Sequence, residues 1–303
     1  MTSPTYLDDF LTWLHDEGKD IKTIKAYNTS VSQYIAWCEQ TTGNTYILQA
    51  KPIDIKEYLG YMKHHLNRSP ATINKSIAAL KTYFSYLSNQ GYISDNPMSR
   101  IKIQKVRPSE LVKGVNKWLT KAEQQRFISY VELEKNELKR LRNLAIVDLM
   151  LYGGLRVSEV EDLKLDDVKV NSNIEITIRE GKHGKYATVL LVEKYSKNLR
   201  KWLKYRQGLT YEVYNDSPYL FVSERAGKLT SRGIQIMVEK YGKLANMEQV
   251  NCHRFRHSFC KNLTNAGVNI QTIADLARHE NINTTRIYVE NSSQERIGAL
   301  EKM

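Results

Sequence analysis

The amino-acid sequence predicts a mainly helical protein with a small β-hairpin in its second half. Apolar residues recur at helical spacing over the first 95 residues, and a basic stretch without sustained periodicity then interrupts the pattern. Later, two short runs alternate between apolar and polar residues, as half-buried strands do. A chain of 303 residues is long enough for two domains, each with its own core. The expected division is a helical domain (1–99), a basic linker (100–116) and an α+β domain (117–303).

The first domain is expected to be a bundle of four amphipathic helices. Ser3-Pro4 and Ser69-Pro70 each place a capping serine before a proline, the combination that favours the start of a helix. Gly18 and Gly91 follow helical runs and indicate where they end. The four apolar stripes span residues 7–14, 24–38, 55–66 and 73–87, and we interpret them as core.

The second domain opens with a predicted capping box, in which Thr120 and Glu123 cap one another's backbone. A helical run over 138–152 ends at Gly153-Gly154. Residues 174–178 and 187–191 then alternate as strands, and Gly181-Lys182-His183-Gly184 forms the basic tip between them. Helical spacing resumes over residues 195–206, 231–244, 253–266 and 269–278.

The charge of the chain favours a polyanionic partner. There are 45 Lys and Arg against 33 Asp and Glu, which gives a net charge of +12. Between residues 98 and 121 there are seven basic residues and one acid, so half of the excess lies around the linker. A plain solvated loop or helix face is the alternative. The candidates for contact with the phosphates of such a partner are Arg100, Lys102, Lys105 and Arg107 in the linker, and Lys75 and Lys81 on the fourth helix.

The sequence predicts no membrane helix, no export signal and no disulfide framework. No run of about 18 apolar residues predicts a membrane helix, and the acidic N-terminal segment is unlike an export signal. Cys38, Cys252 and Cys260 are too few and too scattered for a disulfide framework, which favours a reducing compartment such as the cytoplasm.

The densest cluster of reactive side chains spans residues 252–260. On a helix, Phe255 and Phe259 share one face with Cys252 beside them, whereas His253, Arg256 and His257 share another. Two histidines four residues apart can bind zinc, but Arg256 would repel a divalent cation. The alternative is an anion site, because a guanidinium suits phosphate oxygens and imidazoles add donors or acid–base chemistry.

Two further segments carry candidate residues. Gly154-Leu155-Arg156-Val157-Ser158-Glu159 places an arginine where one helix breaks and the next begins, with a carboxylate three residues later. Read alone, this is a surface ion pair. The segment from His279 through Thr284-Thr285 to Tyr288 ends in one of 19 tyrosines, and any single tyrosine is most often a packing residue.

Taken in order, these motifs resemble the tyrosine recombinases, which include phage and transposon integrases and the Xer recombinases. The family pattern G-L-R-x-S-E is matched at Gly154–Glu159, the hairpin G-K-x-x-K at Gly181–Lys185, H-x-L-R-H-[TS]-F at His253–Phe259, and G-H-x4-T-T-x2-Y up to Tyr288. Gly91 and Asn96-Pro97 also match the end of the family's helical domain. The chain departs from the pattern at Phe255, where the family has Leu, and at Arg278, where it has Gly; Arg278 could shift the local turn or reach a phosphate.

The resemblance implies a helical core-binding domain, an α+β catalytic domain and a site-specific recombinase that forms a 3′-phosphotyrosyl intermediate and a Holliday junction. It implies that Tyr288 is the nucleophile, His253 the base and Lys182 the general acid, with Lys185 as the alternative acid. Arg156, Arg256 and His279 would bind the non-bridging oxygens of the phosphate. Glu159 would support Arg156, and His257 is either a supporting residue or an ordinary polar residue of the helix. No metal or other cofactor is expected.

The implied partner is double-stranded DNA with a specific core site, bound by a tetramer that exchanges strands in pairs. We expect the tail after Tyr288, which contains Ile297 and Leu300, to dock onto a neighbouring protomer; a frayed terminus is the alternative. The start of the chain at core-binding helices favours an Xer-like or resolvase-like member. Other readings are a type IB topoisomerase, a catalytically silent DNA-binding regulator and a zinc-dependent enzyme.

Overall fold

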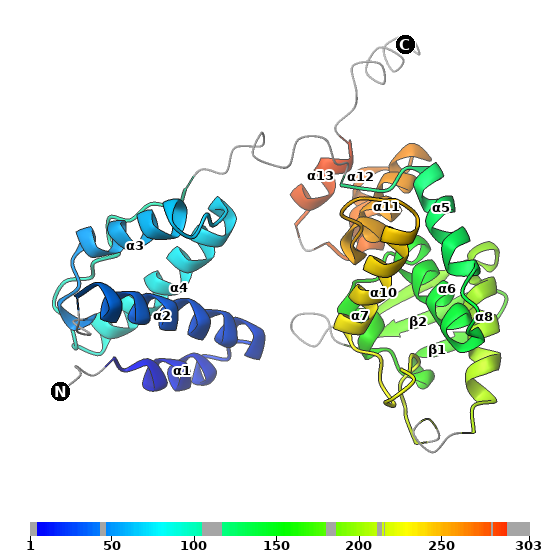
Figure 1. Ribbon diagram of the computed structural model, residues 1–303, viewed down its shortest axis with the longest axis horizontal. Coiled ribbons are helices and arrows are strands. Elements are labelled where there is room, and N and C mark those ends of the chain that lie inside the picture. Colours follow the sequence, from blue (N-terminus) through cyan, green and yellow to red (C-terminus); the bar gives the residue numbers. More distant parts are fainter. Residues whose placement is uncertain are drawn as a thin grey trace, which may run out of the picture. The chain divides into compact units, whose positions relative to one another are not determined.

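The structure is a computed structural model, and it describes residues 5–42, 47–104, 117–179, 186–210, 214, 216–279 and 281–289. The chain forms two compact units, Met1–Lys113 and Gly114–Met303 (Figure 1). Within the described ranges, no helix is both long and apolar enough to cross a membrane. The predicted fold class is confirmed, because helices dominate both units and the second contains one small sheet.

The first unit is a helical bundle with an aromatic core. Tyr34 of α2 lies with its ring centroid 5.1 Å from that of Tyr58 of α3 and 6.0 Å from that of Phe84 of α4, both edge-on. Each of these rings is at most 1% exposed, so the predicted apolar stripes supply the core, except that Leu66, predicted in the third stripe, lies beyond α3 and is 42% exposed. Its elements are α1 (Leu7–Asp16), α2 (Ile21–Thr42), the short 3₁₀ helix η1 (Ile47–Gln49), α3 (Pro52–His64) and α4 (Pro70–Asn89).

The predicted start of the first helix is wrong. Helix α1 begins at Leu7, after Tyr6, whose backbone is left-handed with φ 51°, and not at Pro4 after a Ser3 cap. Tertiary contacts hold this segment out of the helix: the Tyr6 ring stacks on Tyr92 at 3.9 Å, and the Tyr83 hydroxyl donates to the Thr5 carbonyl. By contrast, the Ser69 cap of α4 is confirmed, since its hydroxyl accepts from the Thr72 amide at 3.3 Å.

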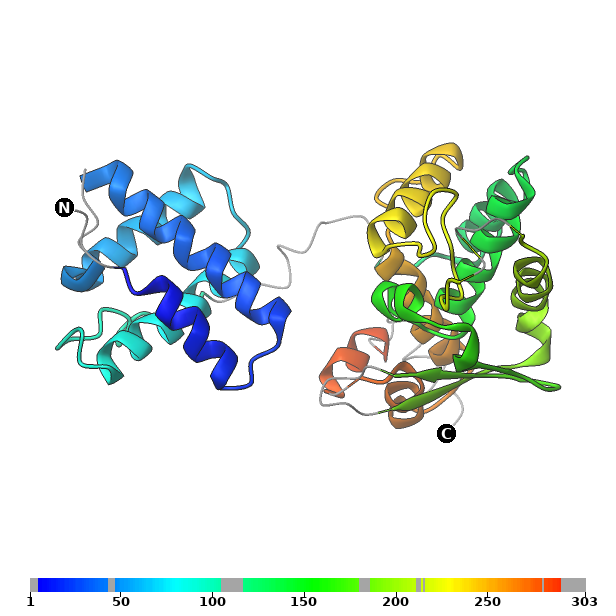
Figure 2. The same ribbon diagram turned by 90° about the horizontal axis from the view of Figure 1, so that it is seen from below.

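The second unit packs helices over a three-stranded antiparallel sheet in the order β1-β2-β3. Figure 2 shows the sheet along one side of this unit, with α6 and α8 over one face. Strands β2 and β3 match the predicted hairpin, whereas β1 was not predicted. The elements are α5 (Lys121–Glu132), α6 (Glu137–Tyr152), α7 (Val157–Asp162), η3 (Leu165–Asp167), β1 (Val168–Val170), β2 (Ile174–Ile178), β3 (Ala187–Leu191), α8 (Glu193–Gln207), α10 (Ser231–Leu244), α11 (Cys252–Asn265), α12 (Ile270–Ala277) and α13 (Asn283–Val289).

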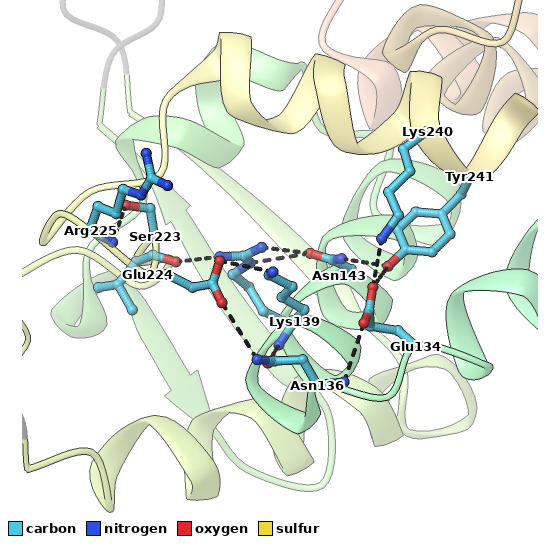
Figure 3. Close-up of polar contacts among 11 residues, drawn as sticks. Glu134, Asn136, Lys139, Asn143, Ser223, Glu224, Arg225, Lys240 and Tyr241 are labelled. Atoms are coloured by element: carbon cyan, nitrogen blue, oxygen red, sulfur yellow. Dashed lines mark hydrogen bonds and ion pairs between the residues drawn. The ribbon is translucent and has the colours of Figure 1, made fainter.

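Polar contacts attach α6 to its neighbours near the N-terminal end of the helix, away from Gly153 (Figure 3). Glu134, just before α6, accepts from Lys240 at 2.8 Å and from the Tyr241 hydroxyl at 2.6 Å, both on α10. These donors lower the pKa of Glu134 to about 2. The buried Arg142 of α6 donates to the Val222 carbonyl at 2.9 Å. These contacts position α6, and the Gly153-Gly154 turn at its C-terminal end lies at the candidate active site.

Candidate active site

Helix α11 places the histidine and arginine cluster as the helical wheel predicts. The Asn251 side chain caps the helix by accepting from the Arg254 amide at 3.1 Å. Phe255 is fully buried, with its ring edge-on to Phe127 at 4.8 Å. His253 is exposed and His257 half-buried, with their ring centroids 5.8 Å apart. One face therefore anchors the helix, and the other presents its polar side chains to the site.

The turn between α6 and α7 depends on Gly154. Its φ is +61°, and a Cβ added there would lie 2.5 Å from the Phe259 ring, so the backbone runs directly against α11. Arg156 follows as the N-cap of α7, and its amide donates to Glu159 Oε2 at 2.8 Å. The close approach of this turn to α11 brings Arg156 beside Arg256.

Glu159 is the carboxylate around which the guanidinium groups gather. Its Oε1 accepts from Arg156 Nη1 at 2.7 Å, and its Oε2 accepts from Arg278 Nη2 at 2.8 Å and lies 4.0 Å from Arg256 Nη1. The side chain of Glu159 is 9% exposed. Burial alone would raise its pKa, but the Arg278 and Arg156 contacts outweigh burial and lower it. Glu159 is therefore a buried anion surrounded by cations.

Arg256 is buried and held by backbone carbonyls. Its Nη1 donates to the Gly154 carbonyl and its Nη2 to the Ala277 carbonyl. Burial, together with the neighbouring charges of Arg156 and Arg278, lowers its pKa to about 10, so it stays charged at neutral pH. Arg156 is more accessible, with 38% of its side chain exposed, and its Nη2 donates to the Arg278 carbonyl at 3.0 Å. The two guanidiniums are thus fixed before any ligand binds.

Two histidines of the site are kept neutral. His279 Nδ1 lies 2.8 Å from Thr285 Oγ1, and burial together with Arg256 and Arg156 lowers the pKa of His279 to about 4. The same two causes lower the pKa of His253. A neutral imidazole can accept a proton or donate a single hydrogen bond.

Tyr288, on α13, is buried with its hydroxyl against α11. The residue is 1% exposed, its hydroxyl is hydrogen-bonded to His257 Nδ1, and Cys260 packs in the same buried cluster. Burial, reinforced by Cys260, raises the pKa of this phenol. Burial also lowers the pKa of His257 to about 4. In this structure the tyrosine is therefore a neutral phenol held by its neighbours, and His257, rather than His253, touches its hydroxyl.

The other predicted site residues lie in different places. Lys182 and Lys185 lie outside the described residues, as do Lys105 and Arg107. Lys75 is exposed and Lys81 half-buried on α4. Arg100 and Lys102 are exposed and line a shallow groove beside α3 with Lys56 and Lys63. Within the described ranges, none of the four groove cations pairs with a carboxylate.

Of the four groove cations, the sequence singled out Arg100 and Lys102 as candidates but not Lys56 and Lys63. Lys56 and Lys63 are seven residues apart, which places both on one face of α3, and that spacing was visible in the sequence. The segment carrying Arg100 and Lys102 is tied to α4 by Asn74, which accepts from the Gln104 amide at 2.8 Å and donates to its carbonyl at 2.9 Å. This long-range tie explains why residues 101–104 lie along the groove.

The thiols beside the site do not favour a metal. Burial raises the pKa of both Cys252 and Cys260 to about 11, which keeps them protonated. In the part of the chain that the structure describes, no three His, Cys, Asp or Glu side chains are grouped as metal ligands would be.

Both halves of the chain are similar to known proteins. Residues 117–295 match the phage integrase family, and residues 6–93 match the phage integrase N-terminal SAM-like domain. The chain is 30% identical to the TnP I resolvase of Bacillus thuringiensis over 92% of this chain and 93% of that protein. It is also 30% identical to tyrosine recombinase XerA of Thermococcus kodakarensis over 98% of this chain and 96% of that one.

Solved structures share the fold. The Tn1549 transposon integrase in complex with a circular intermediate DNA aligns with a TM-score of 0.74 at 22% identity, covering 99% of this chain and all of that one. The XerH recombinase, in a post-cleavage complex with its difH substrate, aligns with a TM-score of 0.73 at 23% identity, covering 91% of this chain and 78% of that one. With both domain matches and the two relatives at 30% identity, the chain belongs to the phage integrase family, the tyrosine recombinases, which are enzymes that cut and rejoin DNA.

Proposed function

We propose that this chain is a site-specific recombinase that cuts and rejoins duplex DNA through a 3′-phosphotyrosyl intermediate, with Tyr288 as the nucleophile. The observation that carries the proposal is the grouping of Arg156, His279 and Tyr288, from separate elements, around Arg256, with the buried carboxylate of Glu159 between the two guanidiniums. The same cleavage on a partner duplex, followed by exchange of the cut strands, would produce the Holliday junction.

Cleavage requires negative charge on the scissile phosphate to be stabilised. Tyr288 Oη attacks phosphorus, the bond from phosphorus to the 5′ oxygen breaks, and the non-bridging oxygens gain charge in the transition state. Arg156 and Arg256 supply fixed positive charge for those oxygens, and His279 supplies one more donor. Because Glu159 neutralises only one of the surrounding guanidiniums, the cluster keeps a net positive charge.

Two proton transfers accompany the reaction. We assign the phenolic proton to His253, whose neutral imidazole lies next to His257 on α11. Lys182 gives its proton to the departing 5′ oxygen. The phosphotyrosine conserves the energy of the cleaved bond, so rejoining to the 5′ hydroxyl of another strand needs no nucleotide cofactor.

Tyr288 must leave its buried position to react. Its hydroxyl is hydrogen-bonded to His257, and its ring packs in a small cluster with Phe259, Cys260, Ile273 and Ala277. Binding of DNA therefore has to exchange these contacts for access to the phosphate. We assign to His257 the role of holding the tyrosine before DNA binds.

The linker, the groove cations and the C-terminal tail serve DNA binding and assembly. The basic linker and the groove cations Arg100 and Lys102 follow the DNA backbone, with Lys75 and Lys81 as further candidates. The tail after Tyr288 docks onto a neighbouring protomer in a tetramer, and the protein acts on DNA in the cytoplasm. Deletion of residues 291–303 tests the docking, because unaltered tetramer assembly on DNA would contradict it.

A covalent capture assay tests the chemistry without knowledge of the site. The probe is a pool of duplexes with a randomised core and a nick that lets the short 5′-hydroxyl fragment diffuse away after cleavage. We expect the chain to form a denaturation-resistant protein–DNA adduct and Tyr288→Phe to form none. Tyr205→Phe, on α8, is the matched control. An adduct that survives Tyr288→Phe would contradict the proposal, and sequencing of the captured duplexes identifies the core site.

A further inference from the structure

Arg278 stands at the turn after α12 in a conformation that non-glycine residues rarely adopt. Its backbone is left-handed, with φ 54° and ψ 49°, and its amide donates to the Asp275 carbonyl at 3.0 Å as the helix ends. A side chain at this position costs free energy, because its Cβ approaches its own carbonyl. Such strain persists where surrounding contacts hold the residue in place, and strained residues are often found at functional sites.

The guanidinium of Arg278 turns back into the site, with 14% of the side chain exposed. Its Nη2 donates to Glu159 Oε2 at 2.8 Å and to the Gly154 carbonyl at 3.1 Å. These two acceptors also hold the proposed phosphate clamp, since Glu159 binds Arg156 and the Gly154 carbonyl accepts from Arg256. Arg278 therefore contacts the supports of both clamp arginines at once.

The backbone of the same turn completes the arrangement. The Arg278 carbonyl accepts from Arg156 Nη2 at 3.0 Å, and the Ala277 carbonyl accepts from Arg256 Nη2. The left-handed conformation at residue 278 directs these two consecutive carbonyls toward the two guanidiniums. A glycine would permit the same backbone but could not provide the guanidinium.

We propose that Arg278 is a positioning residue of the phosphate clamp: it occupies Glu159 Oε2 and the Gly154 carbonyl, and so fixes where Arg156 and Arg256 point. The inference rests on the proposed function. With Oε2 engaged by Arg278 at 2.8 Å, Arg256 stays 4.0 Å from that oxygen and its charge remains available. Without Arg278, Glu159 would draw Arg256 into a full ion pair, and the clamp would lose both geometry and positive charge.

The test compares Arg278→Gly with Arg278→Lys in single-turnover adduct formation on the captured nicked duplex. Glycine permits the left-handed backbone and removes the side chain with its guanidinium, including the Nη1 contact to the Leu276 carbonyl at 3.1 Å. We expect the rate of adduct formation to fall about 10- to 100-fold, which is a smaller loss than for a group that touches the phosphate. The DNA affinity should change by no more than about threefold. Lysine should restore most of the rate, because the single nitrogen Nη2 makes both contacts and an ammonium can replace it. Gln249→Gly, at a left-handed position with φ 52° that is exposed, controls for relief of strain.

A second readout does not depend on activity. The charged and titratable groups that act on His279 are Arg256, Arg156, His257 and Arg278, so removal of one cation should raise the pKa of the imidazole from about 4, as NMR titration can measure. A Gly variant with the wild-type cleavage rate, or with an unaltered His279 titration, would overturn the inference. If the wild-type chain forms no Tyr288-dependent adduct, the proposed function fails, whereas a normal wild-type adduct with an unimpaired Gly variant overturns only the inference about Arg278.

Discussion

The two units hold their positive charges in opposite ways. In the first unit, Lys56, Lys63, Arg100 and Lys102 are exposed along a groove. In the second, three arginines share the acceptors supplied by Glu159 and four backbone carbonyls, and Arg256 is only 6% exposed at its side chain. The net charge of +12 does not distinguish these two kinds of cation.

The difference separates affinity from chemistry. Exposed lysines bind any phosphate of a backbone and release counterions, so their contribution is sensitive to salt and tolerant of substitution. Buried guanidiniums on fixed acceptors are already oriented when DNA arrives, so little reorganisation accompanies the reaction. Changes in the groove should therefore alter binding, and changes in the cluster should alter the rate after binding.

Arg256→Lys is expected to give the largest effect. An ammonium cannot donate in the two directions in which Nη1 and Nη2 meet the Gly154 and Ala277 carbonyls. We expect adduct formation to slow by about 10²- to 10³-fold with DNA affinity nearly unaltered. Single-turnover capture and a gel-shift titration measure the two quantities. The exposed Arg126→Lys on α5 is the control, and an equal loss of affinity and rate in Arg256→Lys would break the proposed separation.

Gly154→Ala is expected to destabilise the second unit by about 2–4 kcal/mol, because it adds both a left-handed strain and an overpacked contact with Phe259. Gly267→Ala is the matched control: its φ is +78°, but no atom lies within 4 Å of the added Cβ. The control should therefore lose only the conformational part, about 1 kcal/mol. Hydrogen exchange of α11 peptides in urea measures both, and equal losses would show that the close approach to Phe259 contributes nothing.

The double variant Lys56→Gln/Lys63→Gln is expected to weaken DNA binding by a smaller amount that depends on salt. If each lysine neutralises one phosphate, the slope of log affinity against log salt should fall by about 2. Adduct formation at saturating DNA should be unaltered. Lys22→Gln, an exposed lysine of α2, provides the control. An unaltered slope would exclude the groove from the DNA interface.

The sequence predicts elements better than it predicts contacts. The strands 174–178 and 187–191 were predicted with their observed bounds because alternation is a local pattern, whereas β1, with three residues, carries too little pattern to detect. The Ser3-Pro4 cap failed because stacking of Tyr6 on Tyr92 overrides local preference. Motif order drew attention to Arg156, Arg256, His279 and Tyr288, but their roles stay predictions. The contact of Arg278 with Glu159 links residues 119 positions apart and has no local signature.

The smallest expected effect is a pH dependence of stability in which two kinds of group oppose one another. His257 and His279 have pKa values lowered to about 4, so the unfolded chain, in which they titrate near 6.5, binds more protons between those values. Their contribution to the unfolding free energy is complete above pH 6.5 and is lost as the pH falls toward 4. Asp148 acts in the opposite sense, because burial raises its pKa to about 7 and favours folding at low pH.

Asp148→Asn removes the opposing contribution and should therefore steepen the loss of stability on acidification from pH 7 to pH 5. Addition of His257→Gln to this variant should make the loss shallower again, because one of the two imidazoles no longer gains a proton on unfolding. Urea unfolding at pH 7, 6 and 5, followed by hydrogen exchange of α6 and α11 peptides, measures these slopes. The carboxylates of Glu134 and Glu159 have lowered pKa values, so their contribution to the unfolding free energy is lost only below about pH 4.5. Between pH 7 and pH 5, the change in stability therefore comes from the histidines and Asp148. Identical slopes in the three proteins would mean that neither the imidazoles nor Asp148 is as desolvated as the structure places them.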